Sequence, residues 1–102
     1  MKDYDLMSQD EKDDVIVGFM RAQEQDLYCL RVNLDRYTIM LTADFKDAEW
    51  RRQIAELLAQ TTTRMIQVES IVQATTQQMP SKERVDASMQ RLRAREAQQQ
   101  PR

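Results

Sequence analysis

The sequence predicts an all-α protein: a long antiparallel helical hairpin, similar to a coiled coil, followed by a shorter third helix in one helical bundle. Apolar residues recur in steps of four and three along two long stretches, which is the spacing of one face of a helix. Glycine occurs once and proline twice in 102 residues, so the turn residues of a many-stranded fold are missing. We expect an acidic lead at residues 1–8, a single helical domain over 9–93 and a disordered tail at 94–102.

The first helix is expected over about residues 9–41. Ser8 and Glu11 form the Ser-x-x-Glu pattern of a capping box, which marks a helix start. A single seam follows, in which only Gln23 is polar, and we expect it to pack against the second helix. Its members are Ile16, Met20, Gln23, Leu27, Leu30, Leu34, Tyr37 and Leu41.

The same helix carries a second apolar ridge, roughly opposite the seam, with Cys29 beside it. Either a third segment of the chain covers this ridge, or it binds a partner. We favour a partner, because large exposed apolar patches are rare in monomers. Tyr28 would be the aromatic anchor and Arg36 the polar rim. The expected partner-binding residues are Val17, Tyr28, Val32, Arg36 and Ile39.

The second helix is expected over about residues 45–78. Thr42 or Asp44 is the candidate N-cap, and so short a connection requires antiparallel neighbours. Apolar residues then recur at helical spacing from Trp50 to Met79, and Pro80 ends the pattern.

The third helix is expected over about residues 81–93, with Ser81 as its cap. Its apolar stripe is short and consists of Val85, Met89 and Leu92. Such a weakly amphipathic helix either packs on the hairpin or stays mobile until a partner arrives. Apolar residues have run out by Arg93, and we expect the chain to fray beyond it.

Charge is distributed unevenly, although the net charge is only −2. Residues 1–14 carry six acids against two lysines, and residues 80–102 carry six bases against three acids. These ends either complement helix dipoles or dock a partner. Possible phosphate contacts in a nucleoprotein complex are Arg84, Arg91, Arg93 and Arg95. A pI of about 5.1 and the absence of aromatics among these arginines argue against nucleic acid.

The sequence offers little for catalysis. Histidine is absent, which removes the usual general base and metal ligand. Cys29 is the only cysteine, so it has neither a disulfide partner nor a histidine to activate it. We expect no catalytic, metal-binding or cofactor-binding residues, no cofactor and no membrane span.

The interpretation that these observations favour is a cytoplasmic, non-enzymatic protein-interaction module: an adaptor, an assembly subunit or a small inhibitor. We expect its partner to be another protein, in a homo-oligomer or a larger complex. The alternative is an accessory subunit of a nucleoprotein complex that contacts phosphates through the arginines.

Overall fold

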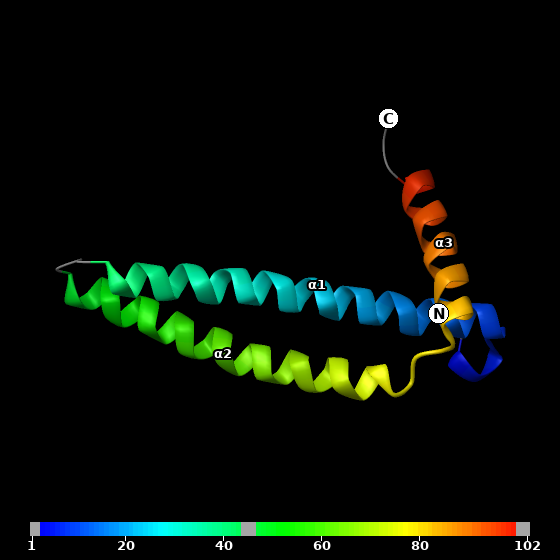
Figure 1. The fold of residues 1–102 in the computed structure, drawn as a ribbon, viewed down its shortest axis with the longest axis horizontal. Coiled ribbons are helices and arrows are strands. Elements are labelled where there is room, and N and C mark those ends of the chain that lie inside the picture. The colour runs from blue at the N-terminus through cyan, green and yellow to red at the C-terminus, as the bar shows by residue number, and fades with distance from the viewer. Residues whose placement is uncertain (1–2, 44–46, 100–102) are drawn as a thin grey trace. The chain divides into compact units, whose positions relative to one another are not determined.

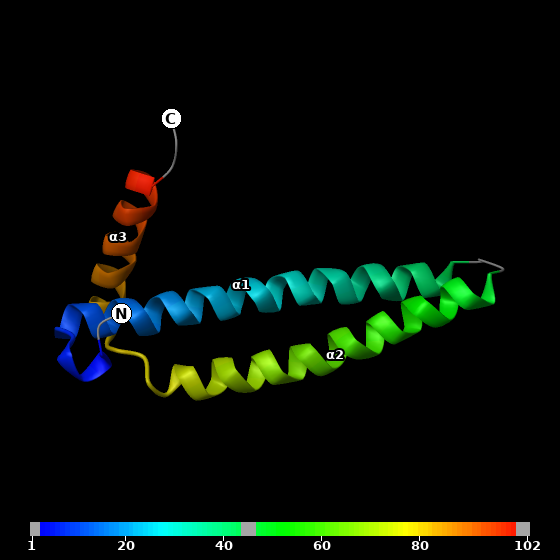
Figure 2. The same ribbon diagram turned by 180° about the vertical axis from the view of Figure 1, so that it is seen from behind.

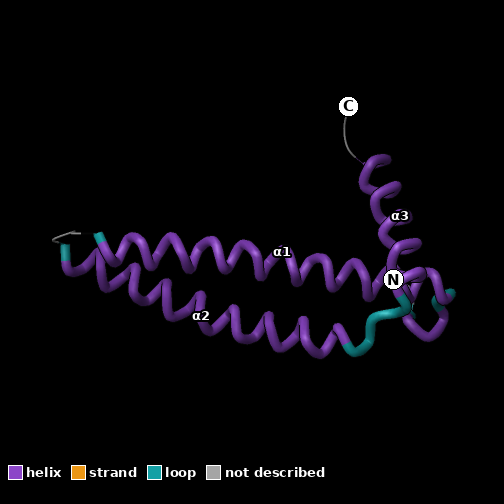
Figure 3. Tube along the Cα trace, in the orientation of Figure 1, coloured by secondary structure: helices purple, strands orange, loops and turns teal. Residues whose placement is uncertain are grey.

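The computed structural model describes residues 3–43 and 47–99, of which 89% are helical and none lies in a strand. A short 3₁₀ helix, η1 (Tyr4–Leu6), precedes three α-helices: α1 (Gln9–Thr42), α2 (Ala48–Thr76) and α3 (Lys82–Gln99) (Figures 1 and 3). Helix α1 packs against both α2 and α3. The prediction of an all-α helical bundle is therefore confirmed.

Helix α1 begins at the predicted capping box. The Ser8 backbone N–H donates to Glu11 Oε1 at 3.2 Å, and the Glu11 backbone N–H donates to Ser8 Oγ at 3.2 Å. Two of the donors that a helix start leaves unpaired are thereby satisfied. Lys12, one turn into the helix, places its Nζ 5.1 Å from the centre of the Tyr4 ring, a cation–π contact that holds η1 against the helix start.

The chain forms two compact units, each built from parts of more than one helix. Residues 23–72 form a unit in which α1 and α2 lie side by side and antiparallel (Figures 1 and 2). Leu27, Ile54 and Val68 are buried in it. Leu27 belongs to the predicted seam and the other two to the apolar face of the second helix, so this pairing follows the sequence pattern.

The start of α2 corrects one prediction. Its N-cap is Asp47, whose Oδ1 accepts from the Trp50 backbone N–H at 3.1 Å. Thr42 is instead the last residue of α1, and its hydroxyl donates to the Ile39 carbonyl at 2.7 Å. A hydroxyl bonded back to its own helix is not free to cap the next one. Asp44 and the expected helix start at residue 45 lie outside the described residues.

The side chain of Arg51 links the start of α2 to the end of α1. The guanidinium of Arg51 donates to the carbonyl oxygens of Leu41 at 2.9 Å and Ala43 at 3.1 Å. These are carbonyls at the end of α1, which have no partner within the helix. One side chain of α2 therefore caps the end of α1.

The second unit contains the start of α1, the last turn of α2 and all of α3. Its buried residues are two aliphatic side chains and three polar ones: Val17, Met20, Asp13, Asp14 and Ser88. The third helix starts as predicted, since Ser81 Oγ accepts from the Arg84 backbone N–H at 3.4 Å.

The expected end of the third helix needs correction. Helix α3 continues to Gln99, beyond the predicted end at residue 93 and into the segment expected to be disordered. The reason is ionic: Arg95 donates to Asp14 at 2.8 Å, and Glu96 pairs with Arg21 at 3.3 Å. Charged contacts with α1 thus replace the apolar residues that the helix lacks here. Residues 100–102 lie outside the described part.

Gln23, the one polar member of the seam, has a buried Oε1 without a hydrogen-bond partner among the described residues. No described helix is apolar over a length sufficient to cross a membrane.

Candidate protein-interaction surface

The expected partner-binding residues are mostly exposed on α1. Tyr28 is 64% exposed and Ile39 is 67% exposed, fractions far above those of core residues. Tyr28, Cys29, Val32, Asn33 and Arg36 line a shallow hollow of about 290 Å³. Ile39 lies on the same face of the helix, one to two turns further on, because residues three, four and seven apart share a face. We call Tyr28, Val32, Arg36 and Ile39 the α1 ridge.

Val17 does not belong to this exposed surface, which corrects the predicted set. It is 1% exposed. On α1 it lies one turn after Asp13 and Asp14 and one turn before Arg21, and all three of those residues bond to α3. Helix α3 therefore covers Val17. Of the two accounts of the ridge, coverage by a third segment holds at Val17, while Tyr28 and Ile39 stay exposed.

The α1 ridge combines side-chain types that bind proteins. Tyr28 offers a flat aromatic surface with a polar end, and Arg36 offers a guanidinium beside it. Cys29 adds an exposed thiol, which accepts a 3.8 Å hydrogen bond from Gln25 Nε2. Asn33 was not among the predicted residues. Its position one turn after Cys29 was the available signal.

The arginines predicted to contact phosphate are largely occupied within the chain. Asp14 accepts from Ser88 Oγ at 2.6 Å, from Arg91 Nη2 at 2.8 Å and from Arg95 Nη2 at 2.8 Å. Asp13 accepts from Arg84 Nε at 2.8 Å. Arg93 is exposed and forms no ion pair with a described residue. Three of the four arginines proposed for phosphate contact thus already bond carboxylates of α1.

These contacts hold both carboxylates in the ionised form. Hydrogen bonds from Arg84 are the main reason that the pKa of Asp13 is lowered, and a bond from Gln9 adds to them while burial opposes them. For Asp14, burial is the largest single influence and would raise the pKa. Hydrogen bonds from Arg91 and Ser88, with the charges of Arg91 and Arg95, together outweigh burial and lower it. The carboxylate bonds likewise raise the pKa values of Arg84 and Arg91.

The uneven charge of the sequence therefore has a third explanation. Acids at the start of α1 pair with bases of α3, and this pairing goes beyond complementing the dipole of each helix. The sequence does show an excess of acids at residues 1–14 and of bases at residues 80–102. It does not show that these two segments meet in the fold. The buried positions of Asp13 and Asp14 were also missed, because acidic residues in the first turns of a helix are ordinarily exposed.

Among the described residues, no group of three or more Cys, Asp and Glu side chains is arranged to hold a metal ion. Comparison of the chain with protein-family models, with curated proteins and with solved structures finds no match.

Proposed function

We propose that this chain is a non-enzymatic protein-interaction module that binds another protein through the α1 ridge. The observation that carries the proposal is the exposure of Tyr28 and Ile39 on one helix face, around a hollow that Val32 and Arg36 help to line. Tyrosine and arginine are the side chains that most often supply binding energy at interfaces. An aliphatic neighbour between them provides surface that a partner can desolvate.

The proposed partner is a second copy of this chain or a subunit of a larger complex. Adaptor, assembly subunit and small inhibitor are all roles of such a module. The proposed compartment is the cytoplasm, because a single exposed thiol suits a reducing environment. The alternative of a nucleoprotein subunit has less support, since Arg84, Arg91 and Arg95 are engaged with carboxylates.

The test compares Tyr28→Ser with a matched control on the other long helix. Ile66 of α2 is exposed to the same 64%, so Ile66→Ser removes a similar exposed apolar side chain outside the ridge. Light scattering and sedimentation velocity measure self-association of the purified chain. Affinity capture from cell lysate, followed by quantitative mass spectrometry, measures binding to other proteins.

We expect Tyr28→Ser to weaken self-association or the capture of a specific protein by about tenfold, the usual effect of losing one interface anchor. Ile66→Ser should leave both unchanged, and both variants should keep the wild-type circular dichroism spectrum. A monomeric wild type whose captured proteins are the same for Tyr28→Ser would rule out the ridge as an interface.

A further inference from the structure

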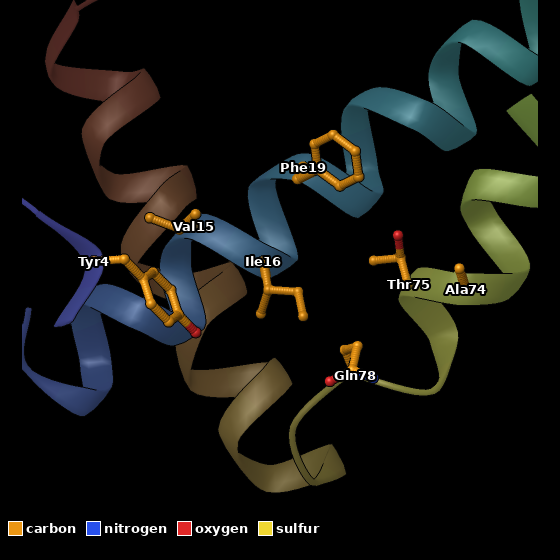
Figure 4. Close-up of a pocket in the computed structure, with 7 residues that line it drawn as sticks. All are labelled: Tyr4, Val15, Ile16, Phe19, Ala74, Thr75 and Gln78. Carbon is orange, nitrogen blue, oxygen red and sulfur yellow. The ribbon is translucent and has the colours of Figure 1, made fainter.

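A second hollow, lined mainly by apolar atoms, lies in the unit that holds the start of α1. It has a volume of about 380 Å³. Figure 4 shows one side formed by η1 and α1 and the other by the last turn of α2 and the residues just after it. Its lining includes Tyr4, Val15, Ile16 and Phe19, with Ala74 and Gln78 opposite. We call it the Phe19 hollow.

The side chains around the Phe19 hollow are unusually exposed for their size. Tyr4 is 52% exposed, Val15 48% and Phe19 45%. These three are among the eight large apolar side chains that stand exposed in the described part of the chain. Contiguous apolar surface of this kind usually marks a binding site.

The hollow occupies a face of α1 that α3 leaves uncovered. In this unit α3 packs on the face that carries Asp14 and Val17, whereas Ile16 lies across the hollow from the last turn of α2. Val15 and Phe19 are one turn apart and lie roughly opposite Val17, at about 100° per residue. A further helix laid between α1 and the end of α2 would cover this face, as ridge-into-groove packing does within bundles.

The charges around the Phe19 hollow are predominantly acidic on one side. Residues 3–12 carry four carboxylates and one ammonium group, and one of these carboxylates, that of Asp10, pairs with Arg91 of α3 at 3.7 Å. Asp3 and Asp5 flank Tyr4, are exposed and form no ion pair with a described residue. The positive group is Lys12, which sits over the Tyr4 ring. Residues 73–78 on the opposite side carry no charged side chain. A partner that fits this surface therefore presents positive charge beside its apolar side chains.

We propose that the Phe19 hollow binds a basic amphipathic helix of a partner protein. The α1 wall of the hollow is one helical turn long, from Val15 to Phe19, or about 6 Å at 1.5 Å per residue. The hollow accordingly accepts two large apolar side chains of the partner, spaced three or four residues apart, in the helix-in-groove mode. Lysine or arginine residues beside these anchors face Asp3 and Asp5. This site is separate from the α1 ridge and does not depend on it.

The probes for the test are two synthetic peptides that share leucines at helical spacing and differ in their polar residues, lysine in one and glutamate in the other. Fluorescence anisotropy gives the dissociation constants of the two peptides for the 102-residue chain. Amide chemical shifts from NMR show which residues respond. We expect the lysine peptide to bind more than tenfold tighter than the glutamate peptide, with shifts concentrated at residues 15–19 and 73–78.

Two variants distinguish binding in the Phe19 hollow from non-specific electrostatic attraction between the acidic chain and the basic peptide. Phe19→Ser removes apolar surface without changing charge and should weaken the lysine peptide about tenfold. The double change Asp3→Asn and Asp5→Asn should reduce the preference for lysine over glutamate. The control is Tyr28→Ser on the α1 ridge, which should leave the peptide affinity unchanged. Val15→Ser provides a second test of the hollow if Phe19→Ser alters the helical content.

Several results would overturn the proposal. Equal affinity for the two peptides would show that the partner need not be basic. Binding that survives both Phe19→Ser and Val15→Ser would show that the peptide does not bind in the Phe19 hollow. Failure of both peptides to bind, while n-octanol shifts the same amides, assigns the hollow to a small apolar ligand instead. Loss of peptide binding in Tyr28→Ser would place the contact on the α1 ridge, which would contradict the present inference and not the proposed function.

Discussion

Asp14→Asn isolates the charge that fixes α3 to α1. The asparagine keeps the size of the side chain and one oxygen for Ser88, but it loses the negative charge that Ser88, Arg91 and Arg95 share. The bond from the buried Ser88 hydroxyl weakens by about 1 kcal/mol when its acceptor becomes neutral. The side chains of Arg91 and Arg95 are 30% and 55% exposed, so water screens their ion pairs and together they contribute about another 1 kcal/mol. The expected loss is therefore about 2 kcal/mol.

Native-state hydrogen exchange measures this loss locally. Opening of α3 exposes its amides, and a change of about 2 kcal/mol corresponds to roughly 30-fold faster exchange across residues 85–95. Asp35→Asn is the matched control, because Asp35 is an exposed carboxylate of α1 without an ion pair to a described residue; it should change no exchange rate. Unchanged exchange of α3 in Asp14→Asn would refute the idea that this carboxylate anchors the helix.

The remaining predictions concern pH and one polar residue of the seam. The pKa values of Asp13 and Asp14 are lowered in the folded chain, so the unfolded chain takes up protons more readily below about pH 4. Above that pH, the two ionised carboxylates contribute their full stabilisation of the folded chain, and this contribution is lost as the pH falls through their folded pKa values. We therefore expect the thermal midpoint of unfolding to drop steeply from pH 4 to pH 2. The drop should be less steep in Asp14→Asn. Gln23→Leu removes a buried oxygen that has no partner among the described residues and should stabilise the chain by about 1–2 kcal/mol in urea unfolding. The control is Gln25→Leu on the exposed side of the same helix, which should not raise the free energy of unfolding. A Gln23→Leu variant less stable than the wild type would show that Gln23 has a hydrogen-bond partner outside the described residues.

Features that depend on neighbours in sequence were predicted well. The capping box at Ser8 and Glu11 and the cap at Ser81 involve residues three apart, so the sequence contains the whole interaction. The apolar seam of α1 was also predicted, because a helix of known period converts spacing directly into a face. Leu27 on that seam is buried, as the pattern requires.

Features that depend on which helix meets which face were not predictable. Val17 and Tyr28 lie on the same side of α1 and looked equivalent in sequence, yet α3 covers only Val17. The arginines of α3 were candidates for an external partner because their internal partners, Asp13 and Asp14, lie more than seventy residues away. The exposure of Phe19 and Val15 likewise depends on where α3 packs. The periodicity of the sequence identifies the apolar faces of a helix. Which element packs on each face is decided by the tertiary fold.

The contacts that attach α3 connect residues 71 to 81 positions apart in the chain, whereas the hairpin pairs helices joined by a short connection. Contacts between distant residues form slowly, since a long loop must close before any of them contributes. During synthesis, the acidic first turns of α1 emerge well before the arginines that neutralise them. The hairpin can therefore assemble first, while the carboxylates of Asp13 and Asp14 are still exposed to water, and α3 packs against the start of α1 afterwards. If unfolding follows the same order in reverse, we expect α3 to be the first element to detach.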